Sequence, residues 1–579
     1  MNTRRLSILH APLVLLPFAS ASACKGDDAL DEVGEATYST GDGDGDSSSA
    51  TETSGSDSTS ETTDTTTTTT TTESTTDTTT DESTTDTTTD TTTETTTGVT
   101  FCEPGQSICQ DDGVVTCLMD GSAYGPPTAC SNSQSCLDGA CVELCVIAEL
   151  QPSSRGCSFF AHKMDNYTDA VNPQPEPNDS FVVGNVSQDI SATVQLYFMP
   201  NGTNIEQAQG GPVVIPPAGT QSFAMTNLPI ESVSQLRKGG TYRVQSDIPV
   251  VAYLHSPLQS INTNDASMLL PEHALRKNHV AASYYPWLTN YYPSYFNVIA
   301  VEDGTNVSWT PPVKTNAGVG VPLVLANGTG QVIMNRGDTL QVVADNHVDI
   351  SGTYISANKA ISVISGSEIV NVPAGVQYAD HIEEQMLPLD YWGDEYVGPR
   401  APPRGAEKFH WRVYGGANNV TVNVSPAQPG FPLNLDRGEW YYFNTTQSLI
   451  FTGNGPFMPV QYLEGKSANG GATTGDPSMY QMVPSEQFLD TYTFTTGIGY
   501  SVNYVQVIRQ MGGPTVFVDG SPVGGYFSVG NYEVADYQVS QGTHFATSNE
   551  PFGIIQLGYT SATSYAYPGG MQLAEINPQ

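Results

Sequence analysis

Basic residues are scarce in this 579-residue sequence, and cysteine is confined to its first third. Lysine and arginine together number 20 against 60 acidic residues, which gives a net charge of −40. Proteins that bind nucleic acid need clustered basic side chains, so the composition excludes nucleic acid as a partner. Long helical periodicity is also absent, apart from a brief stretch at residues 227–238, and this argues against an α-helical fold.

The usual catalytic motifs are missing as well. None of the nine histidines begins an HExxH motif, there is no GxSxG, and Gly465–Ser467 lacks the upstream glycine of a phosphate-binding loop. The segment Asp380–Glu384 is the one cluster suited to acid–base chemistry, but strand alternation would place Glu383 and Glu384 on opposite faces. We therefore predict a structural role for this cluster and no enzymatic activity. A surface hydrolase that uses Asp380–Glu384 is the alternative.

The N-terminus has the pattern of a secretory signal. Arg4 and Arg5 precede an apolar run, Leu6–Phe18, which is too short to span a membrane, and the small residues Ala21–Ala23 precede Cys24. A cysteine directly after small residues resembles the bacterial lipobox, although Ala21 stands where leucine is commonest. The prediction is a signal peptide over 1–23 and a lipid anchor on Cys24, to a bacterial outer membrane or cell surface. Ordinary cleavage before an incidental cysteine is the alternative.

Residues 24–100 have the composition of a tether. Threonine, serine, aspartate, glutamate and glycine dominate, and residues 25–100 hold 19 acidic side chains against one lysine. Such a segment has too little apolar surface to offset the entropy of ordering, and its charges repel one another. We expect a disordered stalk, with the membrane contacted through the lipid anchor only.

The cysteines define a small module that follows the stalk. Eight of the nine lie within 56 residues, at positions 102, 109, 117, 130, 136, 141, 145 and 157 (Cys102, Cys109, Cys117, Cys130, Cys136, Cys141, Cys145 and Cys157). A short exported segment rich in glycine, proline and aspartate cannot build a core unaided, so four disulfides are expected. Zinc is disfavoured because no CxxC pair is present. The module is predicted over 101–145, with Cys157 linking it to the next region.

The remainder repeats itself four times. A Leu-Pro or Val-Pro step followed by a strand-like stretch recurs at Pro271, Pro388 and Pro484, with a weaker first copy at Pro152. Alternating apolar stretches separated by glycine, asparagine or aspartate lie between these steps. The predicted fold is all-β, with four tandem antiparallel β-sandwich-like repeats over 146–270, 271–387, 388–483 and 484–579. A closed, propeller-like ring is the alternative, because the C-terminal segment near Pro578 echoes the earlier proline steps as if it returned to the first repeat.

The repeat junctions carry a family resemblance. The segments Asn264–Pro271, Asp380–Val397 and Pro551–Gly570 resemble the N-terminal domain of the IgG Fc-binding protein family, including its bacterial lipoprotein members. The resemblance covers residues 145–579 and implies a surface binding or adhesion module, with an extracellular protein or glycan as partner. Binding to Fc does not follow, because no Fc-contact residue maps onto this sequence. A purely structural envelope protein is a further alternative.

Two sets of residues are candidates for ligand contact. A dense aromatic run offers a recognition surface, unless it fills the interface between the first two repeats; it comprises Tyr284, Tyr285, Trp287, Tyr291, Tyr292 and Tyr295. No cofactor is predicted. Calcium held by Asp265, Asp380 and Glu384 at the repeat junctions is a weaker hypothesis, since calcium favours clustered carboxylate oxygens.

Overall fold

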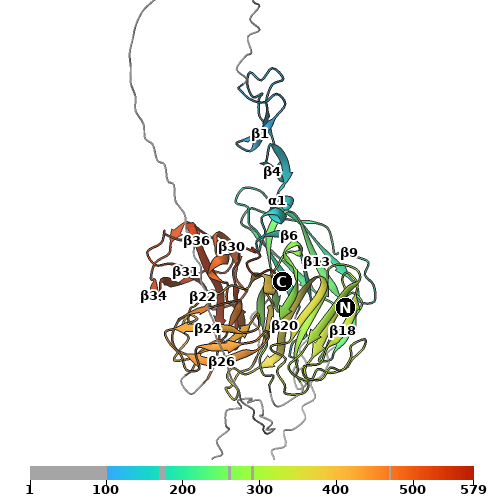
Figure 1. Cartoon of the computed structure of the whole chain (residues 1–579), viewed down its shortest axis with the longest axis vertical. Helices are drawn as coiled ribbons and strands as arrows, with labels where there is room; N and C mark the ends of the chain where they lie inside the picture. Colours follow the sequence, from blue (N-terminus) through green and yellow to red (C-terminus); the bar gives the residue numbers. More distant parts are fainter. Residues whose placement is uncertain (1–100, 168–177, 259–262, 288–291, 468–470) are drawn as a thin grey trace, which may run out of the picture. The chain divides into compact units, whose positions relative to one another are not determined.

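The computed structural model describes residues 101–167, 178–258, 263–287, 292–467 and 471–579. The predicted signal peptide, Cys24 and the stalk lie outside these residues. The described chain is built mainly of antiparallel strands, as the all-β prediction requires (Figure 1). Within these ranges, no helix is both long enough and apolar enough to cross a membrane.

The cysteine-rich module is held together by disulfides, as predicted. Val115 and Cys117 are its only buried apolar residues within residues 101–145, so it has almost no core. The pairs are Cys102–Cys117, Cys109–Cys136, Cys130–Cys141 and Cys145–Cys157. Its elements are β1 (Ser107–Gln110), β2 (Gly113–Thr116), β3 (Thr128–Ala129), β4 (Gln134–Leu137), β5 (Ala140–Glu143) and α1 (Leu144–Leu150).

The helix suggested at residues 227–238 is wrong. That stretch is irregular except for a short strand, β12 (Gln235–Arg237). Although β12 lies in repeat 1 by sequence, it pairs with a strand of repeat 2. Helix α1 instead follows directly on the last strand of the cysteine-rich module, where Cys145 is bonded to Cys157 in repeat 1.

Repeats 1 and 2 share one plan. Each has one eight-stranded sheet in which a long strand pairs with several others, and the next strand folds back on the second half of that long strand. Repeat 1 comprises β6 (Gly156–His162), β7 (Asp179–Asn185), β8 (Ala192–Met199), β9 (Gln207–Ala208), β10 (Val213–Ile215), β11 (Thr220–Met225), β13 (Thr241–Ser256) and β14 (Asp265–Leu269). Repeat 2 comprises β15 (Arg276–Val280), β16 (Ser294–Ala300), β17 (Thr305–Thr310), β18 (Gly330–Met334), β19 (Thr339–Val343), β20 (Tyr354–Val370) and β21 (Asp380–Gln385).

Repeat 4 follows this plan and repeat 3 departs from it. In repeat 3 the long strand is interrupted at residues 454–456, and two four-stranded sheets result. Its strands are β22 (Glu395–Gly398), β23 (Phe409–Gly415), β24 (Val420–Ser425), β25 (Leu433–Leu435), β26 (Trp440–Thr445), β27 (Leu449–Gly453), β28 (Phe457–Tyr462) and β29 (Met479–Gln481). Those of repeat 4 are β30 (Leu489–Thr495), β31 (Val502–Gln510), β32 (Phe517–Val518), β33 (Ser521–Pro522), β34 (Phe527–Val529), β35 (Tyr532–Val539), β36 (Thr543–Thr560) and β37 (Thr563–Pro568).

The recurring prolines occupy equivalent places. Pro271, Pro388 and Pro484 each precede a single turn of 3-10 helix, in η1 (Glu272–Ala274), η2 (Leu389–Tyr391) and η3 (Ser485–Gln487). Pro152 is not followed by such a turn. Its carbonyl instead accepts a hydrogen bond from the N–H of Leu573, near the C-terminus, at 3.1 Å.

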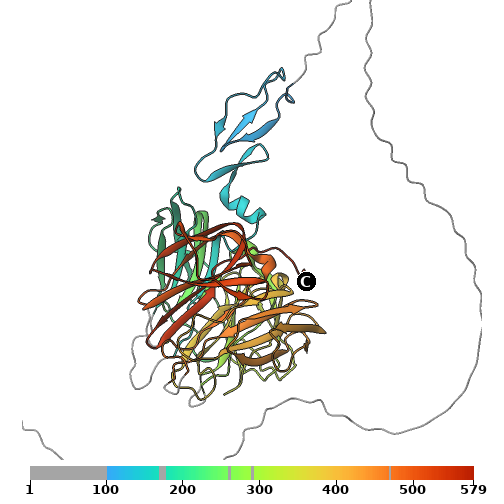
Figure 2. The ribbon, with the colours of Figure 1, turned by 90° about the vertical axis from the view of Figure 1, so that its left-hand side faces the viewer.

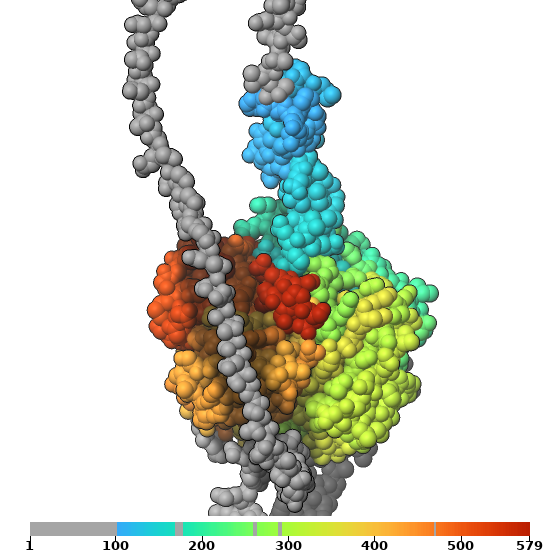
Figure 3. Space-filling model, in the orientation of Figure 1, coloured from blue at the N-terminus to red at the C-terminus, as the bar shows by residue number. Residues whose placement is uncertain are grey.

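The four repeats close on one another. Strands β14, β21, β29 and β37, which we call the closing strands, contact each other in that order, and β37 also contacts β14. Ser154 donates its N–H to the carbonyl of Met571 at 2.9 Å, so the C-terminal residues join the start of repeat 1. Figure 2 shows the first and last repeats against each other, and Figure 3 shows the red C-terminal residues between orange and green segments. The predicted all-β fold of tandem antiparallel repeats is thus confirmed, and contacts between the first and last repeats join the repeats into a ring.

Candidate functional site

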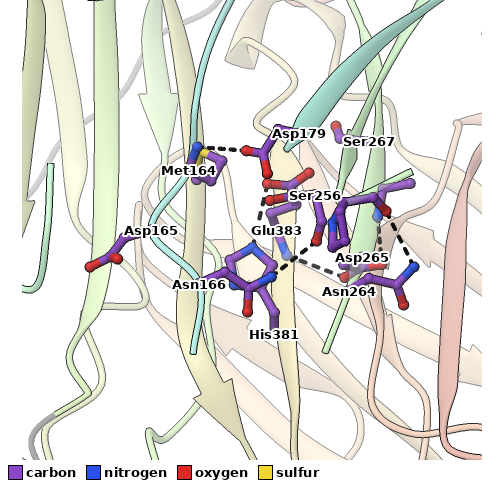
Figure 4. A network of polar contacts seen from close by, with 12 residues as sticks. Met164, Asp165, Asn166, Asp179, Ser256, Asn264, Asp265, Ser267, His381 and Glu383 are labelled. Carbon is purple, nitrogen blue, oxygen red and sulfur yellow. Dashed lines mark hydrogen bonds and ion pairs between the residues drawn. The ribbon is translucent and has the colours of Figure 1, made fainter. Parts of the chain in front are cut away.

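The closing strands bring together a set of buried polar side chains, which we call the polar centre. It contains Asp265, Asp380, Glu383, Glu384, Asp476 and Thr563, with Asp179 and His381 beside them, and all of these are buried. The residues come from all four repeats, because polar residues lie at the start of each closing strand or just before it. Figure 4 shows the part of this centre around Asp179, Asp265 and Glu383.

Asp265 connects three repeats. Its carboxylate accepts hydrogen bonds from the Ser478 hydroxyl at 2.7 Å and from the N–H of Met479 at 3.0 Å, both in repeat 3. It also accepts from the N–H of Glu383 in repeat 2 at 3.2 Å. One side chain of repeat 1 thus holds the closing strands of repeats 2 and 3 in register.

Asp380 makes the complementary connection. Its carboxylate accepts from the N–H of Asn264 in repeat 1 at 2.6 Å and from the Thr563 hydroxyl in repeat 4 at 3.0 Å. Asn264 also bonds Thr563 and Tyr500 of repeat 4. Between them, Asp265 and Asp380 contact all four repeats, which gives the ring a hydrogen-bonded centre.

Burial sets the protonation of this centre. Desolvation raises the pKa of Asp179 to about 8, helped by the nearby carboxyl of Glu383, and it raises the pKa of Asp476 to about 7. Desolvation likewise lifts the pKa of Asp265 and Glu383 well above their ordinary values, although hydrogen bonds to Asp265 oppose the shift. Burial therefore makes the ionised form of each of these acids costlier than it is in water.

His381 lies among these acids. Its Nε2 is 3.5 Å from Oε2 of Glu383, and Figure 4 shows the two side chains directed toward each other. Burial lowers the pKa of His381 to about 4 despite the attraction of Asp179, so the ring stays neutral. Within repeat 1, Met164 donates its N–H to the Asp179 carboxyl at 2.7 Å.

The polar centre is closed to solvent. The side chains of Asp380 and Glu383 are 0% exposed and Glu384 is 1% exposed, so a substrate would reach them only if the repeats separated. Asp265 and Asp380 direct their oxygens at N–H and hydroxyl donors, which a calcium ion would have to displace. Among the residues that the structure describes, no three His, Cys, Asp or Glu side chains are arranged to hold a metal ion.

A second polar site lies between repeats 2 and 3. The buried guanidinium of Arg412, in β23, is 2.6 Å from Oδ2 of Asp349 and donates to the carbonyl of Ser283 at 2.8 Å. Aromatic rings surround it, with Trp440 at 4.1 Å and Tyr284 at 4.5 Å from the guanidinium carbon to the ring centre. An ion pair and cation–π contacts together compensate the desolvation of this arginine.

The predicted aromatic surface divides between core and surface. Tyr284 and Tyr295 are buried, so they belong to the interior and not to an exposed ligand surface. The ring of Tyr284 packs on Tyr462 of repeat 3, and the hydroxyl of Tyr295 donates to the carbonyl of Asp165 in repeat 1. Tyr285 is 48% exposed, and Trp287 and Tyr292 are half-buried, each against Tyr167. Tyr291 lies outside the described residues.

An open groove lies beside Arg412 on the same interface. It has a volume of about 490 Å³ and is lined by Thr310, Pro312, Asn327, Gly352, Tyr354, Leu435, Arg437, Gly438, Glu439 and Trp440. The first five come from repeat 2 and the others from repeat 3. Sequence patterns did not identify it, because its two walls are about a hundred residues apart along the chain.

Two glycines form the base of this groove. Gly352 and Gly438 have φ values of +87° and +81°, which L side chains rarely adopt, and each backbone packs on the other. A Cβ on Gly352 would lie 2.3 Å from the carbonyl oxygen of Gly438. The turn Arg437–Glu439, with its central glycine, is the one sequence signal that marks this close approach.

Comparison with known proteins finds one family model that matches this chain. The model described as IgGFc binding protein matches residues 265–558, about half of the chain, from β14 to β36. The human IgGFc-binding protein is 23% identical over 283 residues, which cover 45% of this chain and 5% of the human protein. The chain thus spans only a small part of that relative. The matched residues include both walls of the groove and three of the four closing strands.

Proposed function

Because the chain belongs to the IgGFc-binding protein family, we propose that it is a binding protein displayed on the cell surface. The observation that carries this proposal is the family match, which covers the interface of repeats 2 and 3 with its open groove. The polar centre supports a role in holding the repeats together, since its carboxyls serve as hydrogen-bond acceptors between closing strands. The ligand is an extracellular protein or glycan, and no enzymatic step is part of the proposal.

The proposal includes attachment to a bacterial outer membrane or cell surface through a lipid on Cys24. The N-terminal pattern of basic residues, apolar run and small residues before this cysteine supports it. Substitution Cys24→Ser should abolish incorporation of labelled fatty acid and release the protein from the membrane fraction. Continued labelling of that variant would contradict the lipid anchor.

Binding is tested with the full exported chain. The Cys24→Ser variant, purified without detergent, serves as bait for proteins and glycans from the surroundings of the cell, and human IgG Fc is included as a separate probe. The proposal expects saturable capture of at least one foreign ligand by the folded bait. The same bait after reduction and heat denaturation is the matched control. Self-association without any foreign ligand would favour a purely structural envelope protein instead.

A further inference from the structure

We propose that the groove between repeats 2 and 3 binds a short oligosaccharide through Tyr354 and Trp440. This inference rests on the proposed binding function and names the ligand class for one site. Nothing in the family match assigns a ligand to these residues, and the predicted aromatic run does not include them.

The charge of the groove favours a neutral polar ligand. Its lining has one basic side chain, Arg437, and one acidic side chain, Glu439, and both are exposed. Asn327 and Thr310 add an amide and a hydroxyl. A phosphate or sulfate group would meet Glu439 and the acidic surface of the protein, whereas sugar hydroxyls can both donate to a carboxylate and accept from a guanidinium.

The aromatic side chains of the groove are fixed before any ligand arrives. Trp440 donates its indole N–H to the carbonyl of Ser351 at 3.3 Å and packs on the Arg412 guanidinium. Tyr354 donates its hydroxyl to Asn278 at 2.8 Å, with the guanidinium of Arg437 4.9 Å from its ring centre. Both rings are half-buried. Apolar faces held in place cost little entropy on binding and suit the C–H face of a sugar ring.

The shape of the groove is set by the backbone. A Cβ on Gly352 or Gly438 would lie within 2.5 Å of the other glycine's carbonyl oxygen, so the absence of both side chains lets the two repeats approach closely at the groove. The volume of about 490 Å³ falls in the range of roughly 300–1,000 Å³ that is usual for ligand pockets. A concave site with two aromatic anchors and a few polar groups suits a compact ligand better than the flat face of a protein.

The test uses the full exported chain as its Cys24→Ser variant on an array of neutral and acidic oligosaccharides two to six sugars long. We expect binding to at least one neutral oligosaccharide, followed in solution by a change in tryptophan emission that is lost in Trp440→Phe. Tyr354→Ala and Arg437→Ala should each weaken binding at least tenfold, while Tyr354→Phe, which keeps the ring face, should bind within threefold of the parent chain.

Matched controls separate the groove from the rest of the surface. Tyr378→Ala removes an exposed tyrosine of repeat 2, and Lys314→Ala removes an exposed cation of the same repeat; neither lines the groove, and both should leave affinity unchanged. Melting curves confirm that each variant is folded.

The outcomes distinguish this inference from the proposed function. Absence of binding on the array, or binding that Tyr354→Ala and Arg437→Ala leave unchanged, overturns the inference. If the same chain still captures a protein from its surroundings, the proposed binding function stands without the groove. If the array shows no binding and the chain captures no foreign ligand, both the inference and the proposed binding function are overturned.

Discussion

The polar centre and the Arg412 site both bury polar groups where repeats meet, yet they do so by opposite means. In the centre, carboxyl groups such as Asp265 and Asp380 accept from neutral N–H and hydroxyl donors, and burial raises their pKa. Between repeats 2 and 3, a cation is paired directly with Asp349 and enclosed by aromatic rings. The stability of the polar centre should therefore respond to pH, whereas that of the Arg412 site should respond to removal of its counter-ion.

Raising the pH should have the largest effect, and it should act on the polar centre. Unfolded aspartate loses its proton near pH 4, whereas burial holds the pKa of Asp476 at about 7 and that of Asp179 at about 8 in the fold. Their contribution to stability is complete below about pH 4 and is lost as pH rises toward 8. Each such group costs about 1.4 kcal/mol per pH unit in that window. Calorimetry of the full chain should show Tm falling from pH 5 to pH 8.

The matched variant for this experiment is Asp179→Asn. An amide cannot ionise, so the fall in Tm with pH should become shallower by the contribution that the Asp179 carboxyl makes in the parent chain. Asp189→Asn, at an exposed position of the same repeat, should leave the slope unchanged. A Tm that is flat or rises over this range would contradict the protonated centre.

Breaking the ion pair should have the next largest effect. Arg412→Met removes the cation and leaves the buried carboxylate of Asp349 unpaired, which should lower the free energy of unfolding by about 3–5 kcal/mol. Denaturant titration at pH 7 measures the loss. Adding Asp349→Leu to the same chain should recover part of it, because no buried charge then remains. Equal stability of the single and double variants would show that the pair is not the cause.

The effect of Asp265→Asn on the free energy of unfolding should be smaller than that of Arg412→Met but still large. The amide nitrogen replaces one acceptor oxygen and faces backbone N–H groups, so at least one buried donor loses its partner, at a cost of about 1–3 kcal/mol. Hydrogen exchange at the N–H groups of Met479 and Glu383 should accelerate together, since one side chain serves both. Acceleration at neither position would contradict the assigned connection.

Tyr285→Ala should have the smallest effect. Tyr285 is 48% exposed and its ring centre is 5.3 Å from the Arg412 guanidinium carbon. Loss of one partly exposed cation–π contact should cost about 0.5–1 kcal/mol in the same denaturant titration. A cost as large as that of Arg412→Met would mean that Tyr285 has a larger share in the interface than its exposure indicates.

Local patterns in the sequence predicted the strands, the disulfides and the equivalent proline steps. Only the C-terminal echo near Pro578 indicates the ring contacts, because Ser154 and Met571, which bond each other, lie near opposite ends of the repeat region. In β23 the charged Arg412 stands between the apolar Trp411 and Val413, a pattern typical of a solvent-facing position. That face is covered by repeat 2, so both sides of the strand are buried.

The same limit applies to the candidate sites. The acidic segment Asp380–Glu384 was recognisable as an unusual cluster, and its place on a closing strand followed from the repeat spacing. Its partners Ser478 and Thr563 come from later repeats, and nothing local in the sequence links them to it. The groove was missed for the same reason, since Tyr354 and Trp440 become neighbours only when repeats 2 and 3 pack.

The disulfide between Cys145 and Cys157 determines how mechanical load would enter the ring. A pull from the N-terminal side passes through this bond directly into β6, and the residues between the two cysteines, Pro152 and Ser154 among them, carry none of it. The contacts of Pro152 and Ser154 with the C-terminal residues are thereby shielded from tension. In β6 the force acts along the strand, at right angles to the hydrogen bonds that Ser158 to His162 form with β13. These hydrogen bonds therefore share the load as shear and do not break one after another.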